Sequence, residues 1–347
     1  MTTTARIAVL GASGYTGAET IRLALGHGGL ELAYLTADRQ AGKPLAAVFP
    51  HLTEAGLPNL VKIDDVPFDQ VDAVFCCLPH GTTQEVIRGL PAHLKVVDLS
   101  ADFRLRDPAL YQQWYGHAHA APALQEEAVY GLTELHRDAV RNARLVANPG
   151  CYPTSAQLPL VPLLAAQAIE RDGIVIDAKS GVTGAGRSLR EDLLFTEVSD
   201  GFHAYGIGNH RHLPEIEQGL TDAAGEAIHV RFTPHLLPMN RGILATTYVR
   251  LGSGVRVADL AQILGEAYAG EPFVALRNGG KAPATREVRG TNRCLISVHA
   301  DRIEGCAILV SVIDNLVKGA AGQAVQNLNL MLGFEETTGL QATATFP

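Results

Sequence analysis

The chain has 347 residues, of which 47% are hydrophobic, 18% are charged and 35 are glycine. This length is sufficient for two domains, and the composition is typical of a compact α/β enzyme and excludes a disordered or fibrous protein. The formal net charge of −8, together with the lack of any long basic run, excludes the charge pattern of a nucleic-acid-binding protein.

The N-terminal segment predicts a buried strand over residues 6–10, a glycine-rich turn and a helix over residues 18–25. No secretory signal pattern precedes the strand, and no segment has the about 18 continuous apolar residues of a membrane span. We therefore expect a cytoplasmic protein without a membrane partner. The five cysteines have no disulfide-framework spacing, so reduced thiols are expected.

The turn Gly11-Ala-Ser-Gly-Tyr-Thr-Gly17 is a variant of the dinucleotide-binding fingerprint. Glycines let the backbone turn tightly and approach a pyrophosphate, which rests on the helix N-terminus. A plain tight turn in an α/β domain is the alternative, but the position between a strand and a helix favours cofactor binding. The predicted cofactor contacts are Gly11, Ser13, Gly14, Tyr15, Thr16 and Gly17.

The second strand is predicted over residues 30–36, and its end bears on the choice of cofactor. NAD sites usually have a carboxylate here for the ribose hydroxyls, whereas a 2′-phosphate requires an Arg and small hydroxyls. Thr36 stands at the strand end and Arg39 follows, which favours NADP. Asp38 follows the same strand, so NAD remains the alternative cofactor.

Two further strands are predicted over residues 71–78 and 94–100. Because ligands of doubly wound sheets bind outside the carboxyl ends of strands, the loop beginning at Pro79 is expected to border the cofactor. His80 in this loop is either catalytic or, more commonly, a hydrogen-bonding residue. The segment 111–126 has no clear period and is expected to be a surface excursion.

The turn Asn148-Pro-Gly-Cys-Tyr-Pro-Thr154 lies between an apolar strand and a predicted helix. A helix N-terminus has free N–H groups and the positive end of the macrodipole, and both favour a thiolate. Cys151 is therefore predicted to be a nucleophile. The alternative is that it is a small buried hydrophobic residue.

A strand over residues 173–179 leads into a second glycine-rich loop, Ser180-Gly-Val-Thr-Gly-Ala-Gly-Arg187. We assign Ser180 and Gly181 to binding the substrate or the nicotinamide end of the cofactor. Arg187 is a candidate for binding an anion.

His210 and His212 lie on a polar loop just before a predicted helix that has Glu215 in its first turn. His210 is the preferred acid/base candidate, because His212 is nearer the helix and suits a cap or a substrate hydrogen-bond donor. Sequence spacing alone does not settle which of the two faces the thiol. No cysteine is near this pair, so no metal site is predicted.

The remaining pattern contains strands over residues 242–251, 294–300 and 306–313 and a helix over residues 257–268. It predicts a second, largely antiparallel sheet with helices on one face, whose other face suits a subunit interface. Asn315 and Lys318, at the start of the final helix, are expected to reach the cofactor.

The predicted fold class is α/β, with a doubly wound parallel Rossmann sheet and a second α+β domain that has a mixed, largely antiparallel sheet. The NADP-binding Rossmann domain is expected to span residues 1–147 and to be completed by the C-terminal helix in 315–347. The catalytic and dimerisation domain is expected to span residues 148–314.

Seven motifs together resemble the N-acetyl-gamma-glutamyl-phosphate reductase family: Gly11–Gly17, the Cys-Leu-Pro-His-Gly ending at Gly81, Asp98–Arg104, Asn148–Thr154, Ser180–Arg187, His210–Glu215 and Asn315–Gln323. The resemblance covers nearly the whole chain. It implies a two-domain architecture like that of glyceraldehyde-3-phosphate and aspartate-semialdehyde dehydrogenases, NADPH as reductant and a place in arginine biosynthesis. The family motif commonly has Thr where this chain has Leu213.

The resemblance also implies a reaction. Cys151 attacks the acyl phosphate of N-acetyl-5-glutamyl phosphate, phosphate leaves, and hydride reduces the thioester while His210 manages the proton. Expected substrate-binding residues are Asn148, Ser155, Arg187, His212 and Glu215, and a homodimer or homotetramer is expected. The alternatives are the same reaction on N-acetyl-aminoadipyl phosphate or aspartyl phosphate, or a non-catalytic NADP-sensing protein.

Overall fold

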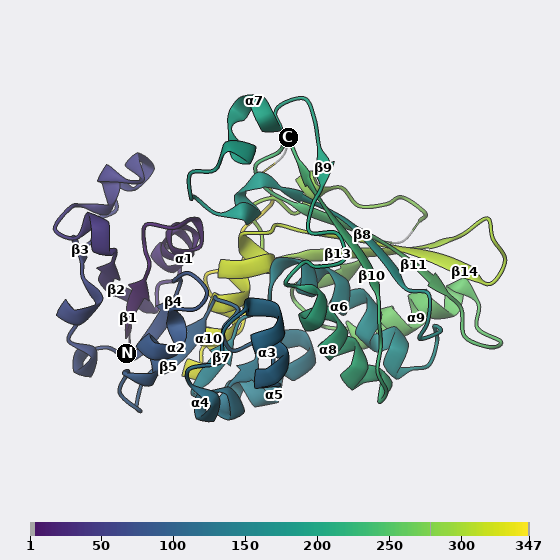
Figure 1. The fold of residues 1–347 in the computed structure, drawn as a ribbon, viewed down its shortest axis with the longest axis horizontal. Coiled ribbons are helices and arrows are strands. Elements are labelled where there is room, and N and C mark those ends of the chain that lie inside the picture. The colour runs from purple at the N-terminus through teal and green to yellow at the C-terminus, as the bar shows by residue number, and fades with distance from the viewer. Residues whose placement is uncertain (1–3, 278, 346–347) are drawn as a thin grey trace. The chain divides into compact units, whose positions relative to one another are not determined.

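The computed structural model describes residues 4–277 and 279–345, which form two compact units, each built on its own sheet (Figure 1). The first unit contains residues 4–149 and 320–342. The second contains residues 150–319 and the tail from Thr343.

The observed boundaries of the two units differ from the predicted ones, slightly where the chain leaves the first unit and more where it returns to it. The chain leaves the first unit after Pro149, where the prediction was residue 147, and returns to it at Ala320, not at residue 315. Asn315 and Lys318 therefore belong to the second unit, because the segment before Ala320 stays bonded to that unit's strands and loops. The predicted ranges also included residues 1–3 and 346–347, which lie outside the described residues.

The sheet of the first unit has the strand order β3-β2-β1-β4-β5-β7-β6, and all its pairings are parallel. The strands are β1 (Ala5–Leu10), β2 (Leu30–Thr36), β3 (Leu60–Val61), β4 (Ala73–Cys76), β5 (Lys95–Asp98), β6 (Val129–Tyr130) and β7 (Leu145–Ala147). The chain winds outward from β1 on one side through β2 and on the other through β4. A ligand crevice is therefore expected beyond the carboxyl ends of β1 and β4.

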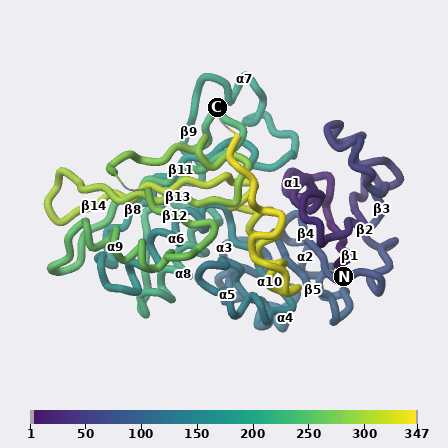
Figure 2. Tube along the Cα trace, turned by 180° about the vertical axis from the view of Figure 1, so that it is seen from behind, coloured from purple at the N-terminus to yellow at the C-terminus, as the bar shows by residue number. Residues whose placement is uncertain are grey.

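The helices of the first unit are α1 (Tyr15–Leu25), α2 (Thr83–Arg88), α3 (Pro108–Tyr115), α4 (Pro122–Glu127), α5 (Thr133–Asn142) and α10 (Gly322–Leu332). Helix α10 packs against α1, α5 and β5, although it lies almost 200 residues beyond some of its neighbours (Figure 2). Its polar side chains are buried and paired: the amide of Asn327 donates to the carbonyl of Gly131 at 2.8 Å. The C-terminal helix thus completes the first unit's core.

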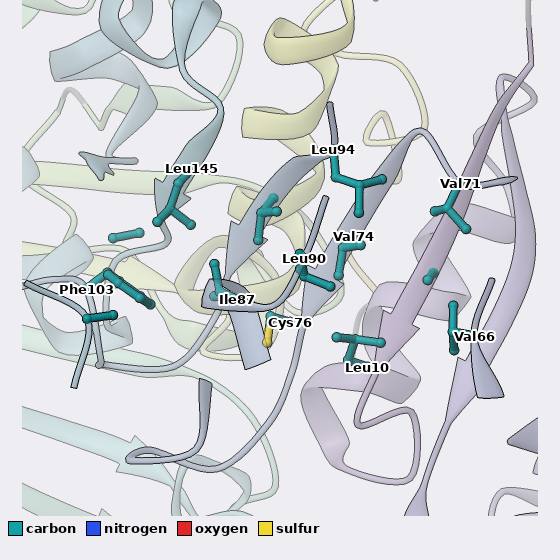
Figure 3. Close-up of a cluster of buried hydrophobic side chains, with 14 residues drawn as sticks. Leu10, Val66, Val71, Val74, Cys76, Ile87, Leu90, Leu94, Phe103 and Leu145 are labelled. Atoms are coloured by element: carbon teal, nitrogen blue, oxygen red, sulfur yellow. The ribbon is translucent and has the colours of Figure 1, made fainter. Parts of the chain in front are cut away.

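Figure 3 shows one side of that core, where side chains from neighbouring parallel strands and the connections between them interlock. These strands are apolar on both faces because helices cover both sides of a parallel sheet. The labelled residues of the cluster are Leu10, Val66, Val71, Val74, Cys76, Ile87, Leu90, Leu94, Phe103 and Leu145.

The segment 111–126, predicted to be a surface excursion without a clear period, is mostly exposed or half-buried as expected, but it is helical. The segment contains most of α3 and α4, and Tyr111 is fully buried. Both helices begin with proline in the first turn, and the Asp107 side chain caps α3 by accepting the N–H of Ala109 at 2.8 Å. Each helix is too short for a hydrophobic period to emerge from the sequence.

The sheet of the second unit has the strand order β12-β13-β14-β11-β8-β10-β9. The strands are β8 (Val175–Gly181), β9 (His203–Ala204), β10 (Arg231–Leu237), β11 (Ile243–Arg250), β12 (Val274–Leu276), β13 (Cys294–Ala300) and β14 (Cys306–Ile313). The β8–β10 and β12–β13 pairs are parallel, and the other pairings of the described strands are antiparallel. The predicted fold class, a parallel Rossmann sheet plus a mixed, largely antiparallel sheet, is confirmed.

The helices of the second unit are α6 (Cys151–Ala165), α7 (Phe195–Val198), α8 (Leu213–Ala224) and α9 (Val257–Ala267). Helix α6 packs against β11, β14, α8 and α9, so it is enclosed (Figure 1). Along β11 the side chains alternate, with one set buried and the other, which includes Tyr248, partly exposed. Within the part of the chain that the structure describes, no helix combines the length and apolar character needed to cross a lipid bilayer.

Two internal prolines interrupt the hydrogen bonds of α6, and side-chain hydroxyls replace the missing donors. Pro159 and Pro162 have no N–H, which leaves the carbonyls four residues earlier without their helical partners. The hydroxyl of Ser311 donates to the carbonyl of Ser155 at 2.7 Å. The hydroxyl of Tyr268 donates to the carbonyl of Leu158. A proline-containing helix is therefore accommodated because its neighbours supply the hydrogen bonds.

We expect Tyr268→Phe to lower the free energy of unfolding by about 1–3 kcal/mol, because it leaves a buried carbonyl without a donor. In a Pro162→Ala background, the new N–H of residue 162 can donate to the same carbonyl, so the cost of Tyr268→Phe should shrink. Urea unfolding of the two single variants and the double variant measures the difference. An equal cost in both backgrounds would contradict this account of the tyrosine.

Candidate active site

Cys151 is the first residue of α6 and directly follows Gly150 at the N-cap. Its thiol is reduced and half-buried. The N-cap residue is a glycine and offers no side chain to cap this helix end, and the first-turn N–H groups and the positive end of the macrodipole act on the thiol. This is the strand-to-helix corner that the sequence predicts, and the local field stabilises a thiolate.

Glu215 fixes the residue before the cysteine. Its side chain is 1% exposed, and Oε1 accepts the N–H of Gly150 at 2.7 Å. The backbone carbonyl of Glu215 accepts the amide of Gln157, in the second turn of α6, at 2.8 Å. Glu215 was predicted to bind substrate; in the structure it links the start of α6 to α8.

An aromatic cluster surrounds His210. Its ring centroid lies 5.5 Å from that of Tyr152, 5.4 Å from Tyr205 and 5.4 Å from Phe232, and the rings meet edge to face. The ring of His212 is 4.9 Å away. The sequence did not single out Tyr152, Tyr205 or Phe232, although the position of Tyr152 next to Cys151 was a usable signal.

This environment keeps His210 neutral. Burial, and secondarily the positive charge of Arg211, lower the pKa of His210 to about 4. Its Nδ1 accepts the N–H of His212 at 3.1 Å, so the neutral ring carries its proton on Nε2. Near neutral pH, His210 is therefore a hydrogen-bond donor through Nε2.

Cys151 and His210 share two tyrosine neighbours. The hydroxyl of Tyr205 donates to that of Tyr152 at 3.1 Å. Burial is the main cause that raises the pKa of Tyr205 to about 12, and the negative charge of Cys151 contributes in the same direction. Cys151 therefore lies close enough to influence the ionisation of Tyr205, a side chain whose ring also contacts that of His210. A nucleophile and a neutral imidazole in one cluster can form a covalent adduct and donate to an oxygen of that adduct.

The other predicted residues near these elements have mostly structural contacts. His212 is at the N-cap of α8, but its side chain does not cap the helix. Ser155 is buried, and its hydroxyl donates to the carbonyl of Tyr152 at 2.9 Å. Ser180 is buried with its hydroxyl on the carbonyl of Gly181, and a Cβ on Gly181 would lie 2.7 Å from the carbonyl of Asn240.

Arg187, Asn315 and Lys318 differ strongly in exposure. Arg187 is exposed in the loop after β8. Asn315 is 2% exposed, accepts the N–H of Gly242 at 2.7 Å and donates to the hydroxyl of Thr183 at 2.9 Å. Lys318 is fully buried, with Nζ 5.8 Å from the centroid of the Phe273 ring. Of the three, only Arg187 presents an exposed charge to a ligand.

In the first unit, the glycine-rich turn fits a dinucleotide. Gly11 has φ +82, and a Cβ on it would lie 2.5 Å from the carbonyl of Cys77; a Cβ on Gly17 would lie 2.5 Å from the carbonyl of Gly11. Gly14 has an ordinary φ of −86, and its Cβ would meet only that same Gly11 carbonyl, at 3.6 Å. Space is therefore left open at the N-cap of α1, where a pyrophosphate binds.

The other predicted residues of this turn, Ser13, Tyr15 and Thr16, are half-buried around the same helix start. Thr36, at the end of β2, accepts the N–H of Gly11 through its hydroxyl at 3.2 Å. Its small side chain therefore holds the turn in place.

A buried carboxylate that the sequence did not identify as a functional residue holds the loop after β4. Asp102 accepts the N–H of Gly81 at 2.8 Å, and the N–H and hydroxyl of Thr83 at 3.1 and 2.7 Å. Pro79 and His80 are exposed in this loop, and Nδ1 of His80 accepts the N–H of Ala101 at 2.9 Å. This contact supports the hydrogen-bonding interpretation of His80.

Asn148 is buried in the first unit and is fully engaged there. Its carbonyl accepts Nε of Arg104 at 2.8 Å, and its side-chain amide donates to the carbonyl of Ala320 at 3.1 Å. Its contact with substrate remains a prediction, and these bonds fix the turn that precedes the cysteine.

Arg39 lies in the first unit beside a pocket of about 530 Å³. The pocket is beyond the ends of β2 and β3 and next to α2. Its lining residues are Asp38, Arg39, Lys62, Ile63, Asp64 and Val86. Two cations, two carboxylates and two apolar side chains line it, so a phosphorylated ribose would have to bind at Arg39 or Lys62.

Comparisons with known families match both units. Residues 6–143 match the family described as "Semialdehyde dehydrogenase, NAD binding domain", and residues 151–315 match "Semialdehyde dehydrogenase, dimerisation domain". The first unit is therefore a nicotinamide-dinucleotide-binding domain.

Curated relatives match over nearly the whole chain. The "Probable N-acetyl-gamma-glutamyl-phosphate reductase, chloroplastic" of Oryza sativa subsp. japonica is 61% identical, over 99% of this chain and 82% of the relative. The "N-acetyl-gamma-glutamyl-phosphate reductase" of Rhodospirillum rubrum is 58% identical, over 98% of each chain.

Solved structures share the fold at low identity. Aspartate semialdehyde dehydrogenase II of Vibrio cholerae, complexed with ASA, superposes with a TM-score of 0.73 at 17% identity, over 95% of this chain and 98% of the other. Aspartate semialdehyde dehydrogenase of Candida albicans, solved with NADP, has a TM-score of 0.68 at 16% identity, over 95% and 99%.

We expect the ring of His210 to remain neutral from pH 8 down to pH 5. Its folded-state pKa, about 4, lies below the value of about 6.5 for an unfolded histidine, so protonation between these values favours unfolding and stability falls as pH falls through this window. Ring ¹³C chemical shifts, assigned by loss of the signal in His210→Asn, report the titration. Arg211→Ala should raise the pKa only part of the way, because burial is the larger cause. A midpoint near 6.5 in the wild-type protein would contradict the buried environment.

Proposed function

Because the chain belongs to the N-acetyl-gamma-glutamyl-phosphate reductase family, we propose that it uses NADPH to reduce N-acetyl-5-glutamyl phosphate to N-acetyl-L-glutamate 5-semialdehyde and phosphate, a step of arginine biosynthesis. The observation that carries this proposal is Cys151 at the N-terminus of α6, directly before Tyr152, whose ring meets that of the neutral His210 edge to face.

The first step is acyl transfer to the cysteine. The Cys151 thiolate attacks the acyl carbon, the C–O bond to phosphate breaks, and inorganic phosphate leaves with the electron pair, so that a thioester remains on Sγ. Negative charge develops on the acyl oxygen in the tetrahedral state. The N–H groups of the first turn of α6 are placed to stabilise this charge.

The second step is reduction of the thioester. NADPH, when bound, supplies a hydride. His210 donates a hydrogen bond from Nε2 to the oxygen anion of the resulting thiohemiacetal, and the electron pair of this oxygen re-forms the C=O bond as the C–S bond breaks. The aldehyde leaves, and Cys151 is regenerated as a thiolate.

The cofactor is proposed to be held by the glycine-rich turn of the first unit, with the pyrophosphate at Gly14 and the N-terminus of α1. The preference for NADP is proposed to come from Arg39, whose side chain lines the pocket at the end of β2. Asp38 lines the same pocket and would disfavour a second negative charge, so the guanidinium is required for 2′-phosphate binding.

Assembly into a homodimer or homotetramer is proposed through the second unit. Its match to a dimerisation domain supports this, as does the partly exposed face of β11 that carries Tyr248. Among the described elements, α6 and α9 pack on the sheet through its buried set of side chains, which leaves the Tyr248 face for a second copy.

We expect Cys151→Ser to lower the phosphate-dependent reduction of NADP⁺ by N-acetylglutamate semialdehyde by on the order of 10³-fold or more, because the nucleophile is lost. Cys306→Ser, at another half-buried reduced thiol of the second unit, is the matched control and should retain activity. In the forward direction without NADPH, wild type should release one phosphate per active cysteine in a burst. An active Cys151→Ser variant would refute the thioester mechanism, and an inactive wild type would move the assignment to another acyl phosphate or to a sensor.

We expect Arg39→Ala to weaken NADPH binding about tenfold or more while it changes NADH binding little, since a charged hydrogen bond to phosphate is worth about 1.5–3 kcal/mol. Isothermal titration calorimetry with both cofactors measures the two affinities. Lys43→Ala removes an equal charge from a nearby residue that does not line the pocket and is the control. Equal losses for NADPH and NADH would show that Arg39 does not contact the 2′-phosphate.

A further inference from the structure

The segment that leaves β14 is anchored within the second unit by a buried carboxylate. Asp314 is fully buried; Oδ1 accepts the N–H of Leu316 at 2.9 Å and of Val317 at 3.2 Å, and Oδ2 accepts the N–H of Gly290 at 2.7 Å. The carbonyl of Asp314 accepts the N–H of Gly319 at 3.0 Å, an i to i+5 bond. The residues Val317–Ala321 accordingly form a π-helical turn.

The next residue, Asn315, ties the same segment to two loops. Its side chain accepts the N–H of Gly242 and donates to the hydroxyl of Thr183. Asp314 and Asn315 together bond to three other parts of the second unit, so the position of the turn that follows is determined.

Gly319 of this turn packs directly on the nucleophile. A Cβ built on Gly319 would lie 2.7 Å from Cβ and 3.2 Å from Cα of Cys151, and 3.2 Å from Cδ1 of Ile313. Real Cβ atoms essentially never approach another atom to within 3.0 Å, so any side chain here must displace something. The cysteine is thus confined from the side of the π-helical turn, while Glu215 holds Gly150 before it.

The backbone conformation does not explain this glycine. Gly319 has no positive φ, and alanine is intrinsically better than glycine in a helical segment by about 0.8–1 kcal/mol. The contact with Cys151 and Ile313 is what excludes a methyl group. The requirement for glycine at this position is therefore a requirement for the close approach of the turn to the cysteine.

We propose that Gly319 is a positioning residue: the anchored turn Asp314–Gly319 packs against Cys151 and fixes its Sγ at the N-terminus of α6. The inference deepens the proposed function and rests on it, since it assigns a means of placing the proposed nucleophile. A displacement of a nucleophile by about 1 Å can cost about 100-fold in rate.

Gly319→Ala tests the proposal, with Gly265→Ala as matched control, because Gly265 is an exposed residue of α9 with nothing within 4 Å of its built Cβ. We expect Gly319→Ala to lower kcat by about 10- to 100-fold with little change in KM. The rate of alkylation of Cys151 by iodoacetamide in the cofactor-free protein, followed by mass spectrometry of the Cys151 peptide, should fall by about tenfold or more. Gly265→Ala should match wild type in both measurements.

Combining Gly319→Ala with Ile313→Val removes Cδ1 of Ile313 and gives the new methyl group room away from Cys151. This double variant should regain part of the alkylation rate, while Ile313→Val alone should stay near wild type. If Gly319→Ala does not fold, the same measurements are made on the double variant. A folded variant that carries Gly319→Ala and has wild-type kcat and a wild-type alkylation rate would overturn the proposal. Failure of both variants to fold would also overturn it, because the contact would then serve folding and not thiol placement.

The two proposals fail differently. If the proposed function is wrong, Cys151→Ser remains active, yet alkylation of Cys151 in Gly319→Ala still falls. If only the role of Gly319 is wrong, Cys151→Ser is inactive and Gly319→Ala alkylates at the wild-type rate.

Discussion

The hydrogen bond from the N–H of Gly150 to the buried carboxylate of Glu215 is the interaction on which the second unit's site depends. Helix α6 starts one residue later, so this bond sets where its first-turn N–H groups point. These groups and the helix dipole create the positive electrostatic field at Cys151. The prolines within α6 make the helix depend on its neighbours, since Ser311 and Tyr268 replace two of its missing donors. The nucleophile is thus placed by contacts from α8, β14 and α9, not by the intrinsic stability of its own helix.

The electrostatics of the cluster favour one proton arrangement. A buried glutamate close to the helix start opposes ionisation of the thiol, while the macrodipole and first-turn amides support it. An imidazolium at His210 would add a second stabilising charge, but burial and Arg211 keep this ring neutral. The backbone amides are therefore the groups that can stabilise a thiolate at Cys151, while the neutral His210 ring carries its N–H on Nε2. Because the pKa of His210 is low, the amides supply the positive field and the imidazole supplies a neutral hydrogen-bond donor.

Much of this architecture was predictable because it is local. A strand, a glycine turn and a helix define the cofactor end of the first unit, and the bounds of β14 agree with the predicted strand 306–313. The cysteine at the helix start followed from the Pro-Gly turn. Contacts between distant segments were not predictable: the sequence does not show that Glu215 accepts the N–H of Gly150, that Asn148 bonds to Arg104, or that Lys318 is enclosed. Each of these polar residues stands in a motif that predicts ligand contact, and the structure adds a buried structural contact that sequence spacing does not reveal.

The buried carboxylates explain why such polar motifs are needed away from the ligand. Asp102 accepts the backbone N–H groups of Gly81 and Thr83 after β4, and Glu215 accepts that of Gly150. Asp314 accepts the N–H groups of Leu316, Val317 and Gly290. Each carboxylate accepts backbone N–H groups that a sharp turn leaves unpaired, and the bonds from Gly81, Gly150 and Gly290 are short, at 2.7–2.8 Å. Asp98 is the exception: burial raises its pKa to about 7, and its bonds go mainly to Ser100, beside Asp102. The bonds from Ser100 favour the ionised form of Asp98, but burial outweighs them, so a buried carboxylate with few backbone donors is harder to ionise.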